Sequence, residues 1–415
     1  MIIIADDLTG ASDSAVPYKE NGFSTIVEVL YEDGDIERYK EYDILSINAD
    51  TRWLDSRQAY EKVYSITRQM SGIDCIYKKI DSVLRGNPAS ELDAVMDAMN
   101  CRLALVAPSF PENGRTVCGG ILAAGDLRID AVELFAHGME RRVEGVLLDT
   151  VRKGTESLEA FLREKQAGGT EVFVLDACTD EDLKIIKETA KLFEEKKVLC
   201  GSAGFAKQVS GDESMVGCGS EFPRKKKENN ARLILAAIGS RSVETACQVK
   251  RVSELFQVPI VQLETKMVLN GCADRAVRAC MDRLTEVIGQ NGELALVTVD
   301  SLFRENKTAA QSGREESEQA MQIVEALGKV VKEVYNRFHV EAIISTGGDT
   351  SLQICKAFCT SGIELLDEIA PGIPIGRMVG GEAESTLIVT KSGGFGIGDA
   401  LVQVIEYIQR RKQFS

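Results

Sequence analysis

The chain has 415 residues, of which 44% are hydrophobic and 27% are charged. This is the composition of a globular protein, and the length exceeds what one ordinary core holds, so two domains are expected. The formal net charge of −15 argues against nucleic acid or an anionic membrane surface as the main partner.

Other whole-chain features predict a cytoplasmic protein. No run approaches the roughly 20 apolar residues that span a bilayer, and the N-terminal MIIIADDLTG has aspartates where a signal peptide would be apolar. The 11 cysteines include no CxxC pair, which favours reduced thiols over a disulfide framework. With only His137 and His339 as histidines, a zinc site or a His-dependent triad is disfavoured.

In the first half, short β-branched runs alternate with longer segments of helical period, which predicts an α/β fold with largely parallel sheets. Residues Arg57–Met70 have helical period, and Asn87 followed by Pro88 predicts the N-cap and first position of a helix that ends at Met99. The expected strands are Ile2–Ala5, Thr25–Leu30, Asp43–Asn48, Cys75–Ile80, Leu103–Ala107, Glu171–Leu175 and Val198–Cys200.

The pattern stops between Gly211 and Arg232, a stretch rich in glycine and charge. Its basic cluster, Arg224–Lys227, is more typical of a solvated linker than of a binding patch. We therefore expect two domains, residues 1–215 and 228–415, each a largely parallel sheet flanked by helices. The strands and the long helix expected in the second half are Leu233–Ile238, Pro259–Leu263, Leu294–Val299, Ala342–Ser345, Thr386–Val389 and Glu316–Phe338.

Polar side chains follow four of the first-half strands, at the carboxyl ends where an open parallel sheet binds its ligands. Arginine and lysine suit a carboxylate or phosphate, while aspartates suit sugar hydroxyls or a metal ion. Asp7 with Thr9 could equally begin the next helix. Together these residues predict a site for a small polyhydroxy acid. They are Asp6 and Asp7, Asn48–Arg52, Lys78–Ser82 with Arg85, and Pro108–Arg115.

Glycine-rich turns follow three of the second-half strands, at Gly239–Ser242, Thr346–Thr350 and Lys391–Gly396. Glycine lets the backbone approach a phosphate closely, and the free N–H groups at a helix start favour an anion. These loops therefore predict nucleotide binding, although none has the P-loop or dinucleotide-binding spacing. We interpret the glycine and proline residues of Pro371–Gly381 as an irregular connection, forming a lid or the adenine-side wall.

Short segments along the whole chain resemble the four-carbon acid sugar kinases, the family that includes threonate, erythronate and 3-oxo-tetronate kinases. The segment after Gly120, ILAAGDLRIDAVELFAHGMERR, departs from the family pattern, which leaves the identity of the acceptor open. The matching segments, in chain order, are IIADDLTGASD, DTR, YKKIDSVLRGN, APSFPENGRTVCGG, GSAGFA, GS, TGGDTS, PGIPIGRMVGG and TKSGGFG.

The resemblance implies an N-terminal domain that binds a sugar acid and a C-terminal domain that binds nucleotide. It also implies transfer of the γ-phosphoryl group of ATP to the C4 hydroxyl of the acid. The residues that it implies as acceptor contacts are Asp6 or Asp7, Arg52, Lys79, Ile80, Asp81 and Ser82. The residues that it implies as ATP contacts are Ser240, Gly347, Gly348, Asp349, Thr350, and Gly393 or Gly394.

For the reaction itself, we expect Arg52 and Lys79, together with Arg85, to hold the substrate carboxylate, and Asp6 or Asp7 to bind hydroxyls. We expect Mg²⁺ to bridge the phosphates of ATP, with its protein ligands left open. Three carboxylates are candidates for the base that orients the attacking hydroxyl, namely Asp349, Asp7 and Asp81. Asp349 could instead be a helix N-cap, and Asp81 could be the partner of a neighbouring base.

Two other classes of protein compete with a kinase. A nucleotide-dependent oxidoreductase of a small hydroxy acid would also have an α/β fold with glycine loops, but the missing dinucleotide fingerprint counts against it. A non-catalytic sugar-acid sensor would bind its ligand without releasing ADP. The sequence leaves open whether the chain forms a homo-oligomer.

Overall fold

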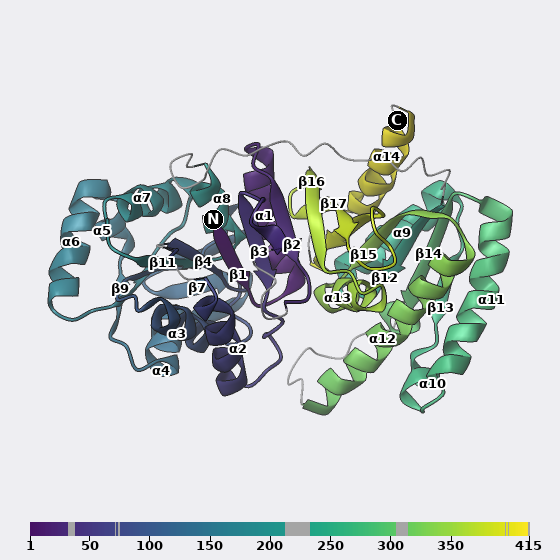
Figure 1. Cartoon of the computed structure of the whole chain (residues 1–415), viewed down its shortest axis with the longest axis horizontal. Coiled ribbons are helices and arrows are strands. Elements are labelled where there is room, and N and C mark those ends of the chain that lie inside the picture. Colours follow the sequence, from purple (N-terminus) through teal and green to yellow (C-terminus); the bar gives the residue numbers. More distant parts are fainter. Residues whose placement is uncertain are drawn as a thin grey trace. The chain divides into compact units, whose positions relative to one another are not determined.

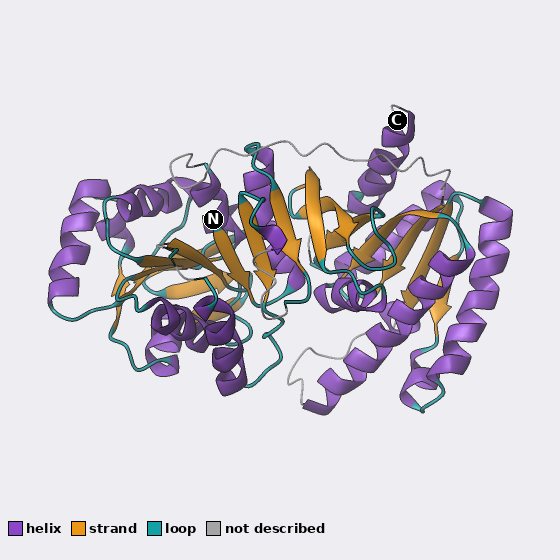
Figure 2. Cartoon of the chain, in the orientation of Figure 1, coloured by secondary structure: helices purple, strands orange, loops and turns teal. Residues whose placement is uncertain are grey.

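The computed structural model describes residues 1–31, 38–70, 72–73, 75–211, 233–303, 314–394, 396 and 398–413. The chain divides into two compact units, Met1–Glu221 and Phe222–Ser415, each with a sheet of its own (Figure 1). The predicted α/β class is confirmed, since both units carry helices on both faces of a largely parallel sheet (Figure 2). The predicted linker, with its basic cluster Arg224–Lys227, lies outside the described residues, so the domain boundary stays a prediction.

The main sheet of the N-terminal unit is parallel throughout its described strands, in the order β2-β3-β1-β4-β11-β5-β10-β9. Its central strands read as continuous apolar runs because helices cover both faces, and every residue of β1 is buried. The strands are β1 (Ile2–Ala5), β2 (Thr25–Glu28), β3 (Ile44–Asn48), β4 (Cys75–Lys79), β5 (Ala104–Ala107), β9 (Val143–Val146), β10 (Val172–Leu175) and β11 (Lys197–Gly201).

Helices α1, α7 and α8 pack together on one face of this sheet, and α2, α3 and α4 on the other (Figure 1). Pro88 begins α3 as predicted, but Asn87 makes no side-chain capping bond. Its Nδ2 instead donates to the carbonyl oxygen of Leu54 at 2.9 Å, which ties the start of α3 to the loop after β3. The helices are α1 (Leu8–Glu20), α2 (Ser56–Arg68), α3 (Pro88–Met99), α4 (Ala131–Gly138), α5 (Leu148–Val151), α6 (Thr155–Ala167), α7 (Asp180–Lys191) and α8 (Ala203–Ser210).

A small antiparallel sheet after β5 was not predicted. It consists of β6 (Arg115–Cys118), β7 (Ile121–Ala124) and β8 (Leu127–Asp130), with β7 in the middle. Gly119 and Gly120, both with positive φ, form the turn between β6 and β7. The segment that departs from the family pattern therefore forms β7, β8 and α4. Strands of four residues at the protein surface carry too few buried positions to show a clear alternation in the sequence.

The sheet of the C-terminal unit has the order β13-β14-β12-β15-β18-β17-β16. In this order, each neighbouring pair among β13, β14, β12, β15 and β18 is parallel. The remaining two pairs, β18 with β17 and β17 with β16, are antiparallel. The strands are β12 (Leu233–Ile238), β13 (Ile260–Leu263), β14 (Leu294–Val299), β15 (Val340–Thr346), β16 (Gly362–Ala370), β17 (Ile373–Val379) and β18 (Leu387–Lys391).

The expectation of an irregular segment at Pro371–Gly381 is wrong, because most of it is a strand of the hairpin β16–β17. Pro371 and Gly372 form its turn, in which Gly372 has a φ of +73°. Gly376 is needed for close strand packing, since a Cβ there would collide with the side chain of Ile363 on β16. The glycine and proline residues of this segment form the turn and the close strand contact of a hairpin. Because such residues are more typical of loops, the sequence pattern did not indicate the two strands.

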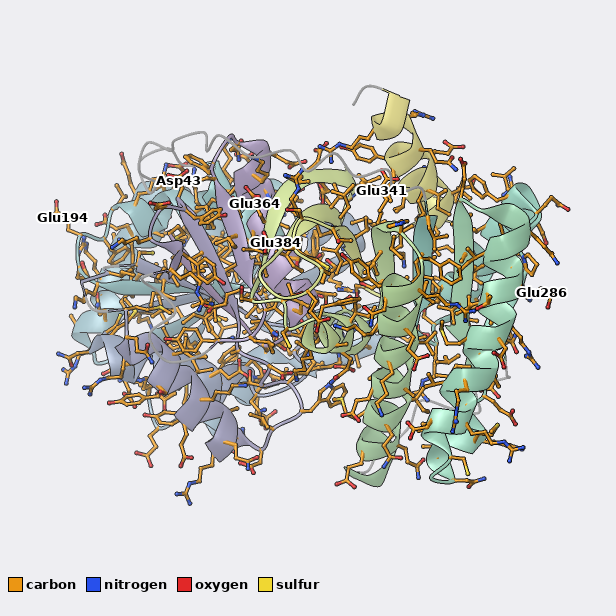
Figure 3. All side chains as sticks on the ribbon, turned by 45° about the vertical axis from the view of Figure 1, so that its right-hand side comes forward. Asp43, Glu194, Glu286, Glu341, Glu364 and Glu384 are labelled. Carbon is orange, nitrogen blue, oxygen red and sulfur yellow. The ribbon has the colours of Figure 1, made fainter. Side chains whose placement is uncertain are left out.

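Helices α9 and α14 contact each other on one face of the second sheet, and α11, α12 and α13 pack in sequence on the other. Among the helices that the structure describes, none combines the length and the apolar character that a bilayer crossing requires. Exposed acidic side chains such as Glu194 and Glu286 point away from the ribbon (Figure 3). The helices are α9 (Val243–Phe256), α10 (Thr265–Leu269), α11 (Ala273–Asn291), α12 (Arg314–Arg337), α13 (Gly348–Ala357) and α14 (Ala400–Gln413).

Candidate functional site

Three neighbouring strands of the N-terminal unit deliver the predicted polar residues to one edge. In the register of the sheet, Ala5 at the end of β1 lies beside Asn48 of β3 and Lys79 of β4. Asp6, the loop after Asn48 and the segment after Lys79 therefore leave the sheet side by side. The structure brings these sequence-distant residues together as the topology of a parallel sheet requires.

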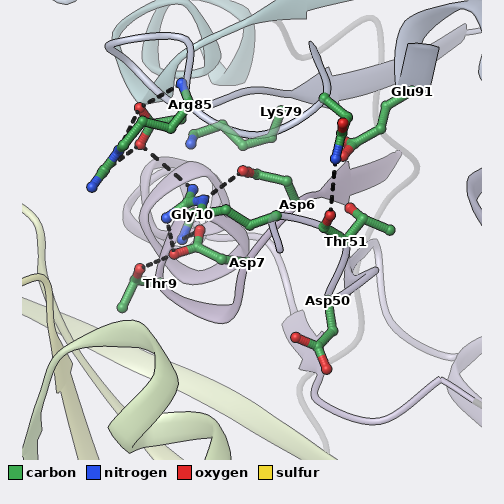
Figure 4. A network of polar contacts seen from close by, with 12 residues as sticks. Asp6, Asp7, Thr9, Gly10, Asp50, Thr51, Lys79, Arg85 and Glu91 are labelled. Atoms are coloured by element: carbon green, nitrogen blue, oxygen red, sulfur yellow. Dashed lines mark hydrogen bonds and ion pairs between the residues drawn. The ribbon is translucent and has the colours of Figure 1, made fainter. Parts of the chain in front are cut away.

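Arg52 is the centre of this cluster and binds Asp6 and Asp7, both of which are labelled in Figure 4. Its Nε donates to Asp6 Oδ2 and its Nη1 to Asp7 Oδ2, both at 2.7 Å, and its Nη2 lies 3.5 Å from Asp81 Oδ2. The side chain is only 12% exposed. Burial disfavours its charge, yet the carboxylates of Asp7, Asp6 and Asp81 raise the pKa of Arg52 well above its ordinary value. Arg52 therefore orders three carboxylates that would otherwise repel one another.

Asp7 begins α1, as one of the two interpretations predicted, and it also belongs to the charge cluster. It is the N-cap of α1, where it accepts hydrogen bonds from the Gly10 N–H at 2.8 Å and from Thr9 Oγ1 at 2.7 Å. Burial by itself raises the pKa of this carboxyl, but Arg52 and Lys79, with these hydrogen bonds, hold the pKa of Asp7 below its usual range. Asp7 is therefore ionised and fixed in orientation.

Gly10 leaves the space in which the cluster closes. A Cβ at this position would lie 2.6 Å from Asp7 Oδ1 and 2.9 Å from Lys79 Nζ. Both distances are shorter than a non-bonded contact allows, so a side chain at residue 10 would displace one of these two groups. The glycine of the DDLTG segment is thus explained by the approach of a lysine from β4.

Asp81 is the partner of neighbouring bases, as one of the two interpretations predicted. Arg85 donates to it twice, from Nε at 3.0 Å and from Nη2 at 2.7 Å. Burial raises the pKa of Asp81, but Arg85 and Arg52 outweigh it and hold the pKa far below its usual range. Ser82 accepts a hydrogen bond from Arg115, so the segment after β5 also reaches the cluster. Ile80 is a buried core residue between these polar positions.

Lys79 acts on the carboxylates of the cluster through its charge, without a hydrogen bond to any of them. The residue is only 5% exposed, and among the described residues its Nζ makes neither a hydrogen bond nor an ion pair. The Oδ1 atom of Asp6 is likewise buried without a hydrogen-bond partner among them. One carboxylate oxygen is therefore buried and unsatisfied beside an ammonium whose donors make no hydrogen bond among the described residues, and a ligand with a carboxylate and a hydroxyl would bind both groups.

Lys78, the neighbour of Lys79 on β4, points to the other face of the sheet, as successive strand residues do. It is 0% exposed, its Nζ lies 2.7 Å from Glu91 Oε2, and it donates to the carbonyl oxygen of Lys79 at 2.7 Å. Burial raises the pKa of Glu91, and the adjacent ammonium opposes that rise. Lys78 and Glu91 form a closed structural pair that fixes the backbone beneath the site.

The three glycine loops of the C-terminal unit meet because β12, β15 and β18 are neighbours in its sheet. The N–H groups of Gly239 and Ser240 donate to the carbonyl oxygen of Thr346 at 3.3 and 3.1 Å. The Gly347 N–H donates to the carbonyl oxygen of Lys391 at 2.8 Å. Each loop is thus hydrogen-bonded to the next.

Small side chains from α9 complete these connections. Ser242, the N-cap of α9, and Thr245 donate to the carbonyl oxygen of Gly393 at 2.7 and 2.9 Å. A Cβ at Gly393 would collide with the Ser240 hydroxyl, whereas a Cβ at Gly394 would have nothing within 4 Å. Gly393 is therefore required by packing, while the neighbouring Gly394 faces open space.

The third loop begins α13 with an uncapped N-terminus. Gly347, with a φ of +98°, is the N-cap and has no side chain with which to cap. The N–H groups of the first helical turn, at Gly348, Asp349 and Thr350, have no partner within the helix and suit an anion. The alternative interpretation of Asp349 as the N-cap is wrong, since Asp349 lies inside the first turn. Thr350 is buried against Gly239.

The sequence placed Ser242 and Lys391 only at the ends of glycine-rich turns, without a role for either, and gave no signal for Thr245. The hydroxyl residues lacked a signal because serine and threonine near a helix start usually cap the helix. Among the residues that the structure describes, no group of three His, Cys, Asp or Glu side chains could hold a metal ion. Mg²⁺ in nucleotide sites needs only one or two carboxylates, with phosphate and water supplying the rest. Asp349 and Glu244, in the first turns of α13 and α9, fit that requirement.

Comparison with known proteins assigns both units. The model of the sugar-binding N-terminal domain matches residues 1–137 and 129–209, and that of the nucleotide-binding C-terminal domain matches residues 235–401. Crystal structures from Salmonella typhimurium and Haemophilus influenzae resemble the chain with TM-scores of 0.75 and 0.68. They are 21% and 23% identical to it, and the matches cover 97% and 99% of this chain and 98% and 99% of theirs.

Curated relatives match over nearly the whole length. A D-threonate kinase of Salmonella typhimurium is 28% identical, with 99% of this chain and 98% of the relative covered. A D-erythronate kinase of Heliobacterium modesticaldum is 26% identical, covering 98% and 97%. A 3-oxo-tetronate kinase of Haemophilus influenzae is 25% identical, covering 96% and 97%. With both domain models matched in order, the chain belongs to the four-carbon acid sugar kinase family.

Proposed function

We propose that this protein is an ATP-dependent kinase that transfers the γ-phosphoryl group to the terminal C4 hydroxyl of a four-carbon sugar acid. The relatives over the whole chain are kinases for D-threonate, D-erythronate and 3-oxo-tetronate. The observation that supports the acid specificity is the buried Lys79, which makes no ion pair with the described residues although it lies beside the ordered carboxylates of the N-terminal unit.

On the acceptor side, Lys79 binds the substrate carboxylate, because it is the cation of the cluster with free donors. Arg52 has its Nε and Nη1 on Asp6 and Asp7, so its main role is to hold these two carboxylates as hydroxyl acceptors. Arg85 forms an ion pair with Asp81, but its side chain is 60% exposed. It can therefore also contact the acid. Ser82 and the backbone of Ile80 complete the pocket wall.

On the nucleotide side, the backbone N–H groups of the first turn of α13, at Gly348, Asp349 and Thr350, bind the phosphates of ATP. Ser240, Gly393 and Gly394 form the opposite loops. A Mg²⁺ ion bound at this edge would supply positive charge to the transferred phosphoryl group. Glu244, in the first turn of α9, would hold the ion together with phosphate oxygens and water.

The base that orients the attacking hydroxyl is assigned by what the three candidates already do. Asp7 and Asp81 have pKa values held below the usual range by their basic partners, which makes them poor proton acceptors. This favours Asp349 among the three. Asp349→Asn is expected to lower kcat by about 100-fold or more with little change in ATP affinity, and near-normal turnover would remove this assignment.

The decisive experiment is an ADP-release assay with purified protein, ATP and Mg²⁺ across D- and L-threonate, D- and L-erythronate, 3-oxo-tetronates and longer aldonic acids. Turnover on a four-carbon acid, with the phosphate located at C4 by NMR, is the expected result. Turnover only on longer acids would indicate that the acceptor is not a four-carbon acid and that the divergent segment after Gly120 accounts for the difference. No ADP release on any acid would overturn the proposal.

The competing classes predict different results in the same assay. An oxidoreductase would change nicotinamide absorbance, and a sensor would bind the acid without releasing ADP. The relatives favour neither class. A cytoplasmic location and a homo-oligomeric state stay predictions, to be tested by fractionation and by light scattering.

A further inference from the structure

Lys391 is a buried cation without a counter-ion, at the end of the strand that leads into the third glycine loop. The residue is 0% exposed. Its Nζ donates to the carbonyl oxygen of Ser392 at 3.0 Å, and no carboxylate among the described residues forms an ion pair with it. An ammonium group has three donors, so most of its hydrogen-bonding capacity is unused. Such a group is costly to bury unless an anion approaches it.

The surroundings of Lys391 add positive potential. The uncapped start of α13 at Gly347 is joined to Lys391 by the hydrogen bond from the Gly347 N–H to the Lys391 carbonyl oxygen. The start of α9 contributes Ser242 and Thr245, which bond the loop that follows Lys391. A helix start carries a partial positive charge, so two such ends and one ammonium gather at the same three loops. The carboxylate that acts on the pKa of Lys391 is that of Glu244 on α9, and this side chain is exposed to solvent.

A second buried polar group points to the same conclusion. Thr346, at the end of β15, lies directly beside Lys391 in the parallel register, so the two side chains lie on one face of the sheet. Its Oγ1 is buried and has no hydrogen-bond partner among the described residues. One donor-rich cation and one free hydroxyl thus lie beneath loops whose glycines allow the close approach of a phosphate.

We propose that Lys391 is a nucleotide-binding residue whose ammonium supplies the positive charge that holds the polyphosphate of ATP against the three glycine loops. This inference deepens the proposed function and rests on it for the identity of the nucleotide. Thr346 is the accompanying hydrogen-bond donor.

The test compares Lys391→Met and Lys391→Gln with the same substitution at an exposed lysine of the same unit, Lys266→Met on α10. Calorimetry measures binding of ATP, ADP and adenosine to each full-length protein. We expect the two Lys391 variants to bind ATP and ADP roughly 10- to 100-fold more weakly, and adenosine equally well. Lys266→Met should match the wild type for all three ligands.

Thermal unfolding without ligand separates binding from a structural role. Removing an uncompensated buried cation should leave the melting temperature unchanged or raise it, whereas loss of a structural contact would lower it. Unchanged ATP affinity in Lys391→Gln would overturn the inference, as would equal losses for adenosine and ATP. Lys391-dependent ATP binding without phosphorylation of any acid would instead overturn the proposed function and leave this inference standing.

Discussion

Lys78 and Lys391 are both completely buried at the ends of central strands, but their surroundings differ. Lys78 in the N-terminal unit has Glu91 at 2.7 Å, and the nearby Arg52 cluster likewise pairs its carboxylates with arginines. Lys391 in the C-terminal unit has a carbonyl oxygen and helix starts around it instead. In the described part of the N-terminal unit, the buried cations Lys78 and Arg52 are paired with carboxylates, whereas Lys79 makes no ion pair. The C-terminal unit forms its loop edge mainly from backbone groups, and the proposed nucleotide would neutralise the charge of Lys391.

The largest effect expected from this contrast is on folding of the N-terminal unit. Lys78→Met would leave the Glu91 carboxylate buried and unpaired, which costs about 3–5 kcal/mol of unfolding free energy. Urea unfolding measures this loss of unfolding free energy. The comparison is Lys391→Met, for which the unfolding free energy should change little. The double variant Lys78→Met with Glu91→Leu should recover most of the loss. A mild effect of Lys78→Met alone would show that the pair does not carry the structural role assigned to it.

The next effect concerns acid binding. Lys79→Met removes the free ammonium of the cluster, so the KM for the acid should rise roughly 10- to 100-fold while the KM for ATP stays unchanged. Steady-state kinetics with each substrate varied in turn measures both constants. The exposed lysine of the same unit, Lys153, provides the matched control as Lys153→Met. An unaltered KM for the acid would mean that its carboxylate binds elsewhere.

Two adjacent glycines sharpen the description of the nucleotide edge. A Cβ at Gly393 would collide with the Ser240 hydroxyl, while a Cβ at Gly394 would meet nothing within 4 Å. Gly393→Ala is therefore expected to raise the KM for ATP by about tenfold, and Gly394→Ala to change it little. Equal effects of the two substitutions would contradict the packing of the third loop against the first.

The smallest effect is a pH dependence of stability. Burial lowers the pKa of Lys391 from 10.5 to about 8, against a small opposing influence of Glu244. Between these values the unfolded chain binds more protons at this residue than the folded chain does, so its contribution to the unfolding free energy rises with pH. Melting temperatures from pH 8 to 10.5, without ligand, should therefore rise relative to those of Lys391→Met. Parallel curves for the two proteins would show that Lys391 is not desolvated in solution.

The sequence by itself predicted the central strands and the three glycine loops, because buried parallel strands read as apolar runs and glycine marks the turns that follow them. It also placed Asp6, Arg52 and Lys79 at strand ends, and the sheet order then brought them together. Short surface strands and the hairpin β16–β17 escaped it, since their glycines and prolines resemble those of loops.

Only the tertiary structure decided which charges neutralise each other. Lys78 and Lys79 are identical neighbours in the sequence, yet one faces Glu91 and the other faces Gly10 and Asp7. The sequence placed Lys391 at the start of a glycine-rich turn, but only the structure showed that it is buried without a carboxylate partner among the described residues. The physical reason is that residue type fixes the charge, whereas burial and the identity of the partner depend on elements far away in the chain.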